Sequence, residues 1–417
     1  MIRFKKFVNH CSVVLFMFII FQSCTTSAEK NEAAPFLQEH IEWMAADERE
    51  GRLAGTLQEA ETANYIADYY QQIGLLPFVD SETYLQQFVL NGPMVQAMGM
   101  ENHISRNVVG AVQGTHYPDR FIIVGAHYDG QGQGGIISMD LNNDPDIHNS
   151  ADDNASGTAG MMWLANRIAE NPAGSSIIFA AFSGEEMGLL GSEYFVERMD
   201  IPRDSVIAMI NLDMIGRLDE GQLSIFGTGT ATIWEELLDE ILVDSLEISK
   251  IPDGLSSSDH ASFSRVGIPV LHYFTNTHDD YHRASDTADK INYEGMEWIL
   301  NHAEQAIRKI DQLQPEEIEF NGSVQPERGP AMLEGVTLGV VPDYNFSGSG
   351  FRIDRVRSGS IAEGAGFRNG DIITQMNNES ITDMFGYMDA LNAFSEGELV
   401  TVTVIRNGAE IELSVQF

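Results

Sequence analysis

The spacing of hydrophobic and polar residues divides the chain into a long region of alternating helices and strands and a short β-rich region. Apolar positions recur about every 3.6 residues at 36–46 and 59–74, which predicts two helices, the second ending at Gly74. Apolar runs typical of buried strands are found at 84–90, 103–112, 119–129, 175–186, 204–216, 221–227 and 266–274. Further helical patterns are found at 157–170, 231–248 and 295–313.

This alternation predicts an α/β domain at 35–313, with a mixed, mostly parallel central sheet flanked by helices on both faces. Residues 314–330, QPEEIEFNGSVQPERGP, are polar and hold three prolines, which indicates a linker. Residues 331–417 contain alternating runs such as ELVTVTVIR and AEIELSVQF, which predict a small β-rich domain. A chain of 417 residues agrees with two folded domains.

The first 24 residues have the layout of an export signal. Arg3, Lys5 and Lys6 precede an apolar run at 13–21, and Ser23-Cys24 follows it. The end of this segment resembles the lipobox of bacterial lipoproteins, which implies a lipid on Cys24 and a tether at 25–34. The alternative is an uncleaved membrane anchor. In both cases we expect an exported protein of the cell envelope that is attached to the membrane only through its N-terminus.

The amino-acid composition disfavours some classes of binding partner and excludes some types of metal ligand. The 62 acidic and 24 basic residues give a net charge of -38, which disfavours nucleic acid and anionic lipid as partners and attracts a substrate with a positively charged terminus. Cys11 and Cys24 are the only cysteines, so the mature body has neither a disulfide nor a thiolate metal ligand.

Polar residues follow three of the predicted strands directly. His127 comes after the run FIIVGA, Glu185 and Glu186 come after IIFAAF, and Asp213 comes after VIAMINL. In an open α/β sheet, ligands bind beyond the carboxyl ends of the strands. We therefore expect these four side chains at one edge of the sheet.

Two further motifs add potential metal ligands. SADDNASG places Asp152 and Asp153 before the helix at 157–170, and the loop TNTHDDYHRASDT contains His282. Carboxylates and imidazoles without cysteine suit zinc, with manganese or cobalt as substitutes. Two such ions carry four positive charges, which three carboxylates and a bridging hydroxide balance, and a remaining carboxylate can act as a base on the bridging water.

The ordered motifs AHYD, SADDNASG, SGEEMGLLGS, NLDMIG, SSDHASF and YHRASDT together resemble the co-catalytic zinc peptidases, which include bacterial leucyl aminopeptidases, glutamate carboxypeptidases and glutaminyl cyclases. The resemblance covers about residues 36–313. It implies two zinc ions, with His127 and Asp213 on one, Glu186 and His282 on the other, and Asp153 shared between them. It also implies that Glu185 is the general base.

Three further features, two single aspartates and one tripeptide, have less specific roles. Asp129, two residues after His127, is predicted to accept the second ring N–H of that histidine and so to assist catalysis. Asp152 is the rival of Asp153 as the shared ligand. Ser258-Asp259-His260 has the residue types of a serine triad, but three consecutive residues cannot align a nucleophile, a base and an orienting group. We expect this stretch to line the pocket or to fix a loop.

These features predict an exported zinc aminopeptidase that hydrolyses N-terminal residues from peptides with a free N-terminus, by a metal-bridging hydroxide with Glu185 as general base. The alternatives are a carboxypeptidase, a glutaminyl cyclase, or an inactive peptidase-fold protein that presents its second domain to other envelope proteins. The second domain resembles a PDZ domain in residues 358–377, SGSIAEGAGFRNGDIITQMN, and more weakly in TLGVV, 337–341. This implies a groove that binds a peptide C-terminus at a loop over residues 335–340, or else a stability or dimerisation module without a ligand.

Overall fold

The structure, a computed structural model, describes residues 33–417 except 80–81, 136, 141–144, 256–257, 323–335, 344–345, 347, 358, 383–385, 388–389, 392 and 396. The predicted export signal, the tether up to residue 32 and the predicted linker from residue 323 onward lie outside the described residues. Among the helices of the described part, none combines the length and apolar character needed to span a bilayer.

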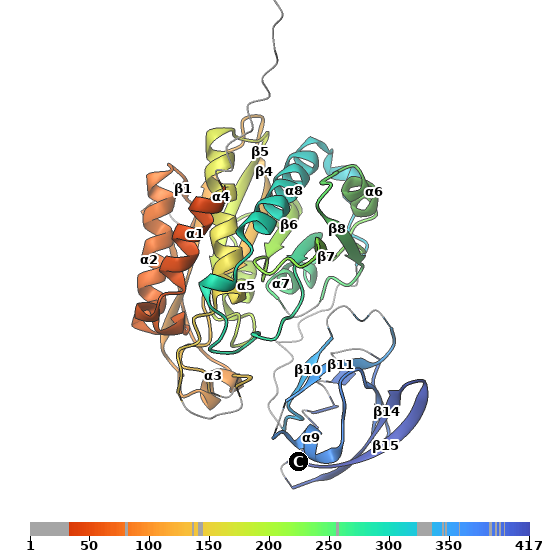
Figure 1. Ribbon diagram of the computed structural model, residues 1–417. Helices are drawn as coiled ribbons and strands as arrows, with labels where there is room; N and C mark the ends of the chain where they lie inside the picture. Colours follow the sequence, from red (N-terminus) through yellow and green to blue (C-terminus); the bar gives the residue numbers. More distant parts are fainter. Residues whose placement is uncertain are drawn as a thin grey trace, which may run out of the picture. The chain divides into compact units, whose positions relative to one another are not determined.

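A nine-stranded mixed sheet of described strands forms the centre of the first domain (Figure 1). Its middle consists of four parallel strands in the order β5 (Ser175–Phe182), β4 (Tyr117–His127), β6 (Val206–Leu212) and β9 (Val270–Phe274). Every residue of β5 and β6 is buried, as expected for strands covered on both faces.

The outer strands are paired mainly antiparallel. β3 (Ile104–Val112) lies beside β5 and pairs with β1 (Leu76–Pro77) and β2 (Leu85–Val89). At the other side, β7 (Gln222–Phe226) is antiparallel to β9 and parallel to β8 (Glu247–Ile251). The predicted α/β sheet is thus confirmed as a mixed sheet, with its parallel pairs concentrated in the centre.

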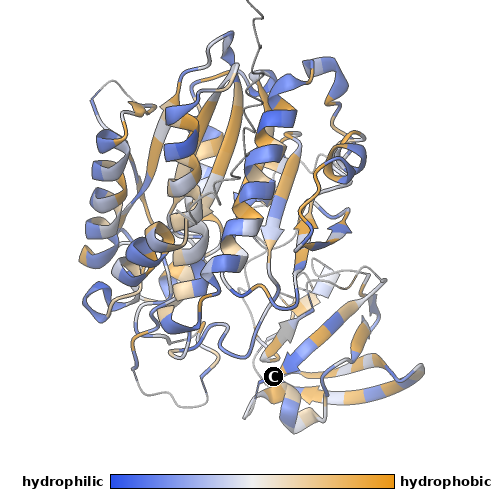
Figure 2. Cartoon of the chain, turned by 45° about the horizontal axis from the view of Figure 1, so that its top comes forward, coloured by the Kyte–Doolittle hydropathy of each residue, from blue (hydrophilic) through white to orange (hydrophobic). Residues whose placement is uncertain are grey.

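Helices cover both faces of this sheet. One face carries α1 (Ala33–Met44), α2 (Leu57–Gln72), α4 (Gly157–Glu170), α6 (Trp234–Asp239) and α8 (Tyr293–Gln312), which share one large apolar core with the strands. The opposite face carries α5 (Leu190–Arg198) and α7 (His260–Ser264), packed around Phe182, Phe195 and Phe263. Figure 2 shows the hydrophobic strands enclosed by helices whose outer faces are hydrophilic.

Shorter elements complete the domain. A short helix, α3 (Pro93–Ala97), lies between β2 and β3. Three short helical turns are η3 (Arg203–Ser205), η4 (Ala288–Lys290) and η5 (Pro315–Glu317), whereas η1 (Asp47–Arg52) and η2 (Ala151–Ser156) are irregular turns with non-helical residues inside. The predicted helix end at Gly74 is confirmed, because α2 ends at Gln72 and this glycine, which follows the C-cap Ile73, has a φ of +77°.

Two boundaries differ from the sequence expectations. The helix predicted at 231–248 is wrong beyond Asp239, because residues 247–251 form strand β8, whose long-range pairing with β7 overrides the local helical pattern. Residues 314–321, expected to belong to the linker, pack on the first domain: Ile318 is buried in its core, and the Asn321 N–H donates to the Thr230 carbonyl at 2.8 Å. The first domain therefore continues to Asn321.

The second domain is an antiparallel sheet with its own apolar core, built around Leu338, Ile353 and Val402. Its main strands are β10 (Val340–Pro342), β11 (Phe351–Val356), β12 (Ile372–Met376), β14 (Leu399–Arg406) and β15 (Ala409–Gln416), in that order. β13 (Glu379–Ser380) pairs with β12, and α9 (Ile361–Ala365) follows β11. The small β-rich second domain is thus confirmed.

Candidate metal centre

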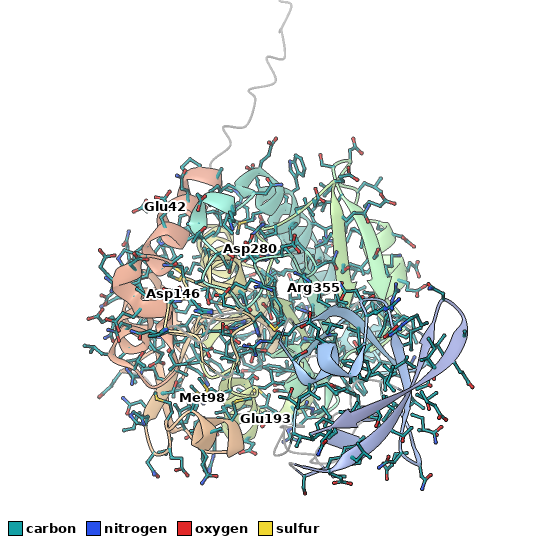
Figure 3. All side chains as sticks on the ribbon, turned by 60° about the horizontal axis from the view of Figure 1, so that its bottom comes forward. Glu42, Met98, Asp146, Glu193, Asp280 and Arg355 are labelled. Atoms are coloured by element: carbon teal, nitrogen blue, oxygen red, sulfur yellow. The ribbon has the colours of Figure 1, made fainter. Side chains whose placement is uncertain are left out.

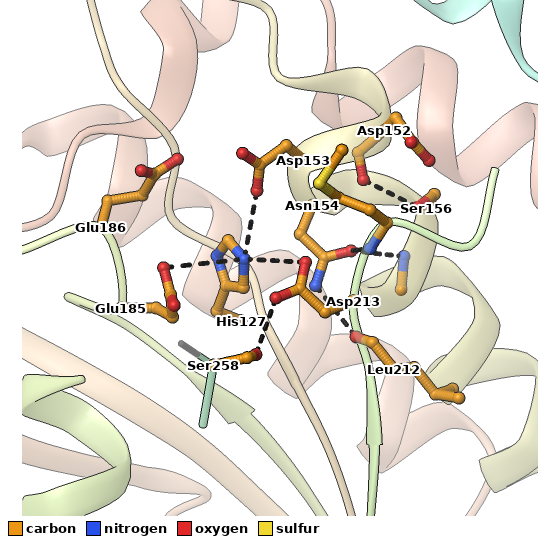
Figure 4. Close-up of polar contacts among 12 residues, drawn as sticks. His127, Asp152, Asp153, Asn154, Ser156, Glu185, Glu186, Leu212, Asp213 and Ser258 are labelled. Atoms are coloured by element: carbon orange, nitrogen blue, oxygen red, sulfur yellow. Dashed lines mark hydrogen bonds and ion pairs between the residues drawn. The ribbon is translucent and has the colours of Figure 1, made fainter. Parts of the chain in front are cut away.

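The order of the parallel strands brings the predicted ligands together. His127 is the last residue of β4, which lies between β5 and β6. Glu185 and Glu186 follow the end of β5, and Asp213 follows the end of β6. The four side chains therefore lie at the same edge of the sheet, as Figure 4 shows.

Asp153 connects two groups of potential ligands. In the first group, Nε2 of His127 lies 3.3 Å from Oδ1 of Asp153 and 3.4 Å from Oδ1 of Asp213. In the second group, Nε2 of His282 lies 3.2 Å from Oδ2 of Asp153 and 3.5 Å from Oε2 of Glu186. The ligand atoms of each group lie within 4.8 Å of one another, and the two carboxylate oxygens of Asp153 face different groups. Each group could therefore hold one cation, and Asp153 would then be shared between the two.

The turn η2 determines which of the two adjacent aspartates faces this centre. Oδ1 of Asp152 accepts the Gly216 N–H at 2.7 Å, and its Oδ2 lies 3.0 Å from Nε2 of His278. Both Asp152 oxygens are therefore engaged outside the two groups. The Asp286 carboxylate, which sequence reasoning missed, accepts the backbone N–H groups of Asp152 and Asp153 at 2.9 and 3.1 Å.

Asn154, in the same turn, ties this segment to the end of β6. Its Oδ1 accepts the N–H groups of Gly157 and Met214 at 2.8 and 3.1 Å, and its Nδ2 donates to the Leu212 carbonyl at 3.0 Å. The Asp153–Asn154 peptide bond is cis. An asparagine three residues before the start of a helix is a possible capping signal, although the sequence does not reveal its reach to β6.

Asp129 supports His127 mainly through its backbone. Nδ1 of His127 lies 3.2 Å from the Asp129 carbonyl oxygen but 3.7 Å from the Asp129 carboxylate. A carbonyl can only accept, so Nδ1 carries a proton and Nε2 is the ring nitrogen that faces the ligand group, where its lone pair becomes available when the ring is neutral. The Asp129 carboxylate instead accepts the backbone N–H of Glu185 at 3.3 Å, which links the β4 end to the glutamate pair.

The electrostatics of the centre favour bound cations. Burial raises the pKa of Glu185 well above its usual range, and the Asp213 carboxylate reinforces this shift although His127 opposes it. Burial and then the Asp153 carboxylate raise the pKa of Glu186 in the same way. Burial by itself lowers the pKa of His127, but the surrounding carboxylates, Asp213 first, hold it well above normal. A divalent cation would relieve this crowding of buried negative charge.

Buried polar atoms without a hydrogen-bond partner provide an independent test of whether these residues suit a metal ion. Nε2 of His127, Oδ1 of Asp213 and Oε1 of Glu186 are buried and lack a hydrogen-bond partner among the described residues. Buried polar atoms normally have partners, so these three need a further group to contact. Imidazole nitrogen and carboxylate oxygen are suitable zinc ligands, so the residues fit the expected metal.

Ser258 fixes one of these ligands. Its hydroxyl donates to Oδ2 of Asp213 at 2.7 Å and accepts a hydrogen bond from Nδ2 of Asn211 at 2.7 Å. His260 instead stacks on His272, with ring centroids 4.4 Å apart, and is buried. The three residue types of a serine triad are thus adjacent without forming one. Gln131, which carries no sequence signal, donates to Oε2 of Glu186 at 3.3 Å.

His282 lies on a loop that is held by ion pairs. Asp280, labelled in Figure 3, lies 3.0 Å from the Arg217 guanidinium and 2.6 Å from the Lys290 ammonium. The backbone of His282 has a positive φ of 56°, and its carbonyl accepts the N–H of Met139 at 2.8 Å. Several distant segments therefore determine the position of this ligand.

Comparison with known proteins matches residues 107–307 to peptidase family M28 and residues 329–417 to the PDZ domain. A probable zinc metalloprotease of Phaeosphaeria nodorum is 37% identical over 116 residues, which are 26% of this chain and 23% of that protein. The alkaline phosphatase isozyme conversion protein of Escherichia coli is 32% identical over 183 residues, 44% of this chain and 51% of that protein. Aminopeptidase YwaD of Bacillus subtilis is 27% identical over 214 residues, 47% of this chain and 42% of that protein. The matches thus cover from 23% to 51% of the length of these relatives.

Solved structures share the fold of the first domain. BSAP, a zinc aminopeptidase from Bacillus subtilis, superposes with a TM-score of 0.54 at 18% identity, covering 69% of this chain and 98% of that chain. A Zn-dependent exopeptidase from Parabacteroides distasonis gives a TM-score of 0.53 at 18% identity, with 67% and 98% covered.

Proposed function

We propose that this protein is an aminopeptidase with two zinc ions per chain, because residues 107–307 match peptidase family M28, while residues 329–417 match the PDZ domain. The observation that carries the proposal is that the potential metal ligands and the potential general base are different residues. Asp153 directs one oxygen to each ligand group, whereas Glu185 belongs to neither group.

The chain's own residues can perform peptide hydrolysis in this arrangement. Bound zinc would polarise the scissile carbonyl and lower the pKa of a water molecule. The Glu185 carboxylate lies 4.0 Å from Nε2 of His127, beside the ligands, so it can take a proton from the attacking water and deliver it to the nitrogen of the leaving amine. The net charge of -38 favours substrates with a free ammonium group.

Two neighbouring substitutions test this proposal. Glu185→Gln keeps size and polarity but cannot accept the proton, so we expect about two zinc equivalents and a turnover rate lower by roughly a hundredfold or more. Glu186→Gln should instead reduce zinc occupancy at one position, with partial recovery in excess zinc. Elemental analysis and hydrolysis rates distinguish the two. Wild-type turnover by Glu185→Gln with both metals bound would disprove the general-base role.

The type of reaction is tested separately with peptides that differ only at their ends. Mass spectrometry should detect stepwise loss of N-terminal residues from free peptides and no loss from N-acetylated ones. Loss from the C-terminus, cyclisation of N-terminal glutamine, or no reaction with zinc bound would each contradict an aminopeptidase.

We also propose that the protein is exported and lipidated at Cys24, which is supported by Arg3, Lys5, Lys6 and the apolar run at 13–21. Labelled palmitate should be incorporated in the native host, and Cys24→Ala should abolish incorporation and release the protein from membranes. Unchanged labelling in the variant would exclude Cys24.

For the second domain, we propose binding of a peptide C-terminus. In support, β10 is the terminal strand of its sheet and, among the described strands, pairs with β11 alone, which leaves an edge for an added peptide strand. Gly339, before β10, has a φ of +73° that permits the tight loop expected to hold a carboxylate.

A further inference from the structure

Arg52, at the end of η1, is an unusual buried cation. The residue is 0% exposed, and its guanidinium donates to four backbone carbonyls: Tyr128 at 2.9 Å, Met44 at 2.6 Å, Asn149 at 2.9 Å and Ser150 at 2.9 Å. All four of these acceptors are backbone carbonyl oxygens, although most buried guanidinium groups are paired with an acid.

These carbonyls belong to the segments that carry two predicted metal ligands. Tyr128 directly follows His127, whereas Asn149 and Ser150 directly precede the turn η2 that holds Asp153. One planar guanidinium therefore holds both segments in a fixed relation, which is the geometry for which arginine is suited.

The backbone around Arg52 reinforces the same contact. The N–H groups of Gly130 and Gly132 donate to the carbonyls of Arg52 and Gly51 at 3.3 and 3.0 Å. Gly51 has a φ of +67°, and a Cβ there would lie 2.4 Å from the Gly132 carbonyl oxygen. The close approach of η1 to the loop after β4 thus requires glycine at position 51.

The charge of Arg52 also lies among the acids of the centre. Burial lowers the pKa of Arg52 to about 10, while Asp129, Asp286, Asp153 and Glu186 act in the opposite direction. The guanidinium therefore remains protonated at neutral pH and opposes the mutual repulsion of these carboxylates.

We propose that Arg52 is a positioning residue of the metal centre, which holds the segments of His127 and Asp153 in place and supplies a fixed positive charge before metal binds. This inference rests on the proposed zinc-dependent function. Arg52 does not itself contact the ligand side chains, so its effect should appear first in metal affinity and metal geometry.

Arg120 offers a matched control. It is also buried, at 8% exposure, and it donates to the Leu313 and Asp311 carbonyls at 2.9 and 2.5 Å, but it lies near the start of β4, at the opposite end of the strand from His127. It also has an acid partner, Asp311, at 3.4 Å. Arg120→Met should therefore lower the melting temperature and leave metal affinity unchanged.

The test measures zinc affinity by chelator competition and the absorption spectrum of the cobalt-substituted protein. Arg52→Met should weaken zinc binding about tenfold or more, the scale for groups that position ligands, and alter the cobalt spectrum. Arg52→Lys keeps the charge but cannot contact all four carbonyls in the same geometry. Its zinc affinity should therefore lie between that of Arg52→Met and that of the wild type. Wild-type affinity and spectrum in folded Arg52→Met would overturn the proposal. If the wild type itself binds no zinc, the proposed function fails as well.

Hydrogen exchange of the wild-type protein keeps the proposal testable if the variants do not fold. The Gly130 and Gly132 amides, which donate to η1, should remain protected after zinc is removed with a chelator, because Arg52 is present before the metal. Exchange at the rate of an unfolded chain after zinc removal would mean that the metal, and not Arg52, holds these segments.

Discussion

At the scale of single residues, side chains that are adjacent in the sequence have different surroundings at the metal centre. Oε2 of Glu186 lies 3.5 Å from His282 and accepts a hydrogen bond from Gln131, whereas the carboxylate of Glu185 lies beside His127. Asp152 and Asp153 differ in the same way, because only Asp153 faces both ligand groups. Roles at this centre thus depend on the direction of a side chain rather than on its residue type.

Ser258 should influence metal binding although it is not a predicted ligand. Ser258→Ala removes the hydroxyl that donates to Asp213, so we expect zinc affinity to fall by roughly tenfold to a hundredfold. Ser262→Ala is the control, since its hydroxyl contacts Ser192 at 2.9 Å and no predicted ligand. Chelator competition measures both variants, and equal affinities would show that Ser258 does not fix Asp213.

His302 should make folding stability dependent on pH. It is buried on α8 with Nδ1 3.0 Å from the Tyr273 hydroxyl, and burial lowers its pKa to about 4. The unfolded chain therefore binds a proton that the folded chain does not take up between about pH 6.5 and about pH 4. Stability is lost across this window as the pH falls, by up to about 1.4 kcal/mol per pH unit for this one group.

Substitution of His302 isolates this contribution. His302→Asn should reduce the slope of unfolding free energy against pH, measured by urea denaturation with chelator present. Tyr273→Phe removes the hydrogen bond but keeps the histidine. It should lower the unfolding free energy at every pH and leave the slope against pH unchanged. Identical slopes in His302→Asn and the wild type would refute the assignment.

At the scale of secondary-structure elements, the centre depends on the junction between η2 and α4. This junction lies against the end of β6, where the Asn154 side chain connects Leu212, Met214 and Gly157. A Cβ on Gly157 would lie 2.2 Å from the Leu212 carbonyl oxygen. The helix can begin here only because this position has no side chain.

Two glycines of α4 test this requirement for a residue without a side chain, because only one of them lies against backbone. Gly157→Ala must displace backbone, so we expect a loss of about 3 kcal/mol of stability, the upper range for overpacking, together with weaker zinc binding. One turn later, a Cβ on Gly160 would meet only the side-chain ends of Ile215 and Leu300 at 2.9 and 3.0 Å. Gly160→Ala should therefore change stability by less than about 1 kcal/mol, since helix propensity offsets the crowding. Similar losses in both variants, measured by thermal denaturation, would contradict this account.

At the scale of the whole molecule, no apolar core of the described residues is shared between the two domains. The core of the first domain includes residues from Ala33 to Ile318, and the core of the second includes residues from Leu338 to Phe417. Each sheet is also built only from strands of its own domain. This organisation predicts that the two domains fold independently.

A chain that ends at Gly322 tests this independence. It keeps Ile318 and the contact of Asn321 with Thr230, so it should fold, bind zinc and cleave short peptides at a rate close to that of the full protein. A chain that ends at Leu313 is the comparison and should be less stable, because it lacks the buried Ile318. Failure of the longer form to fold would mean that the second domain belongs to the catalytic core.

The sequence alone was sufficient to predict the sheet, the two domains and the residues that assemble at the centre. Apolar periodicity records the burial of each local segment, and parallel strands necessarily end at one edge, so His127, Glu185, Glu186 and Asp213 could be placed together. Asp153 and His282 were identified from their motifs.

Only the tertiary structure decided features that depend on contacts between distant segments. The strand at 247–251 forms because β7 is available for pairing, and the His127 ring is held by the Asp129 carbonyl rather than mainly by its carboxylate. Arg52 lies in a charged stretch, DEREGR, that is typical of solvent exposure, yet it is buried between carbonyls of three segments. Such features cannot be recognised from the periodicity of the sequence. The interactions that determine them are made with residues up to about a hundred positions away.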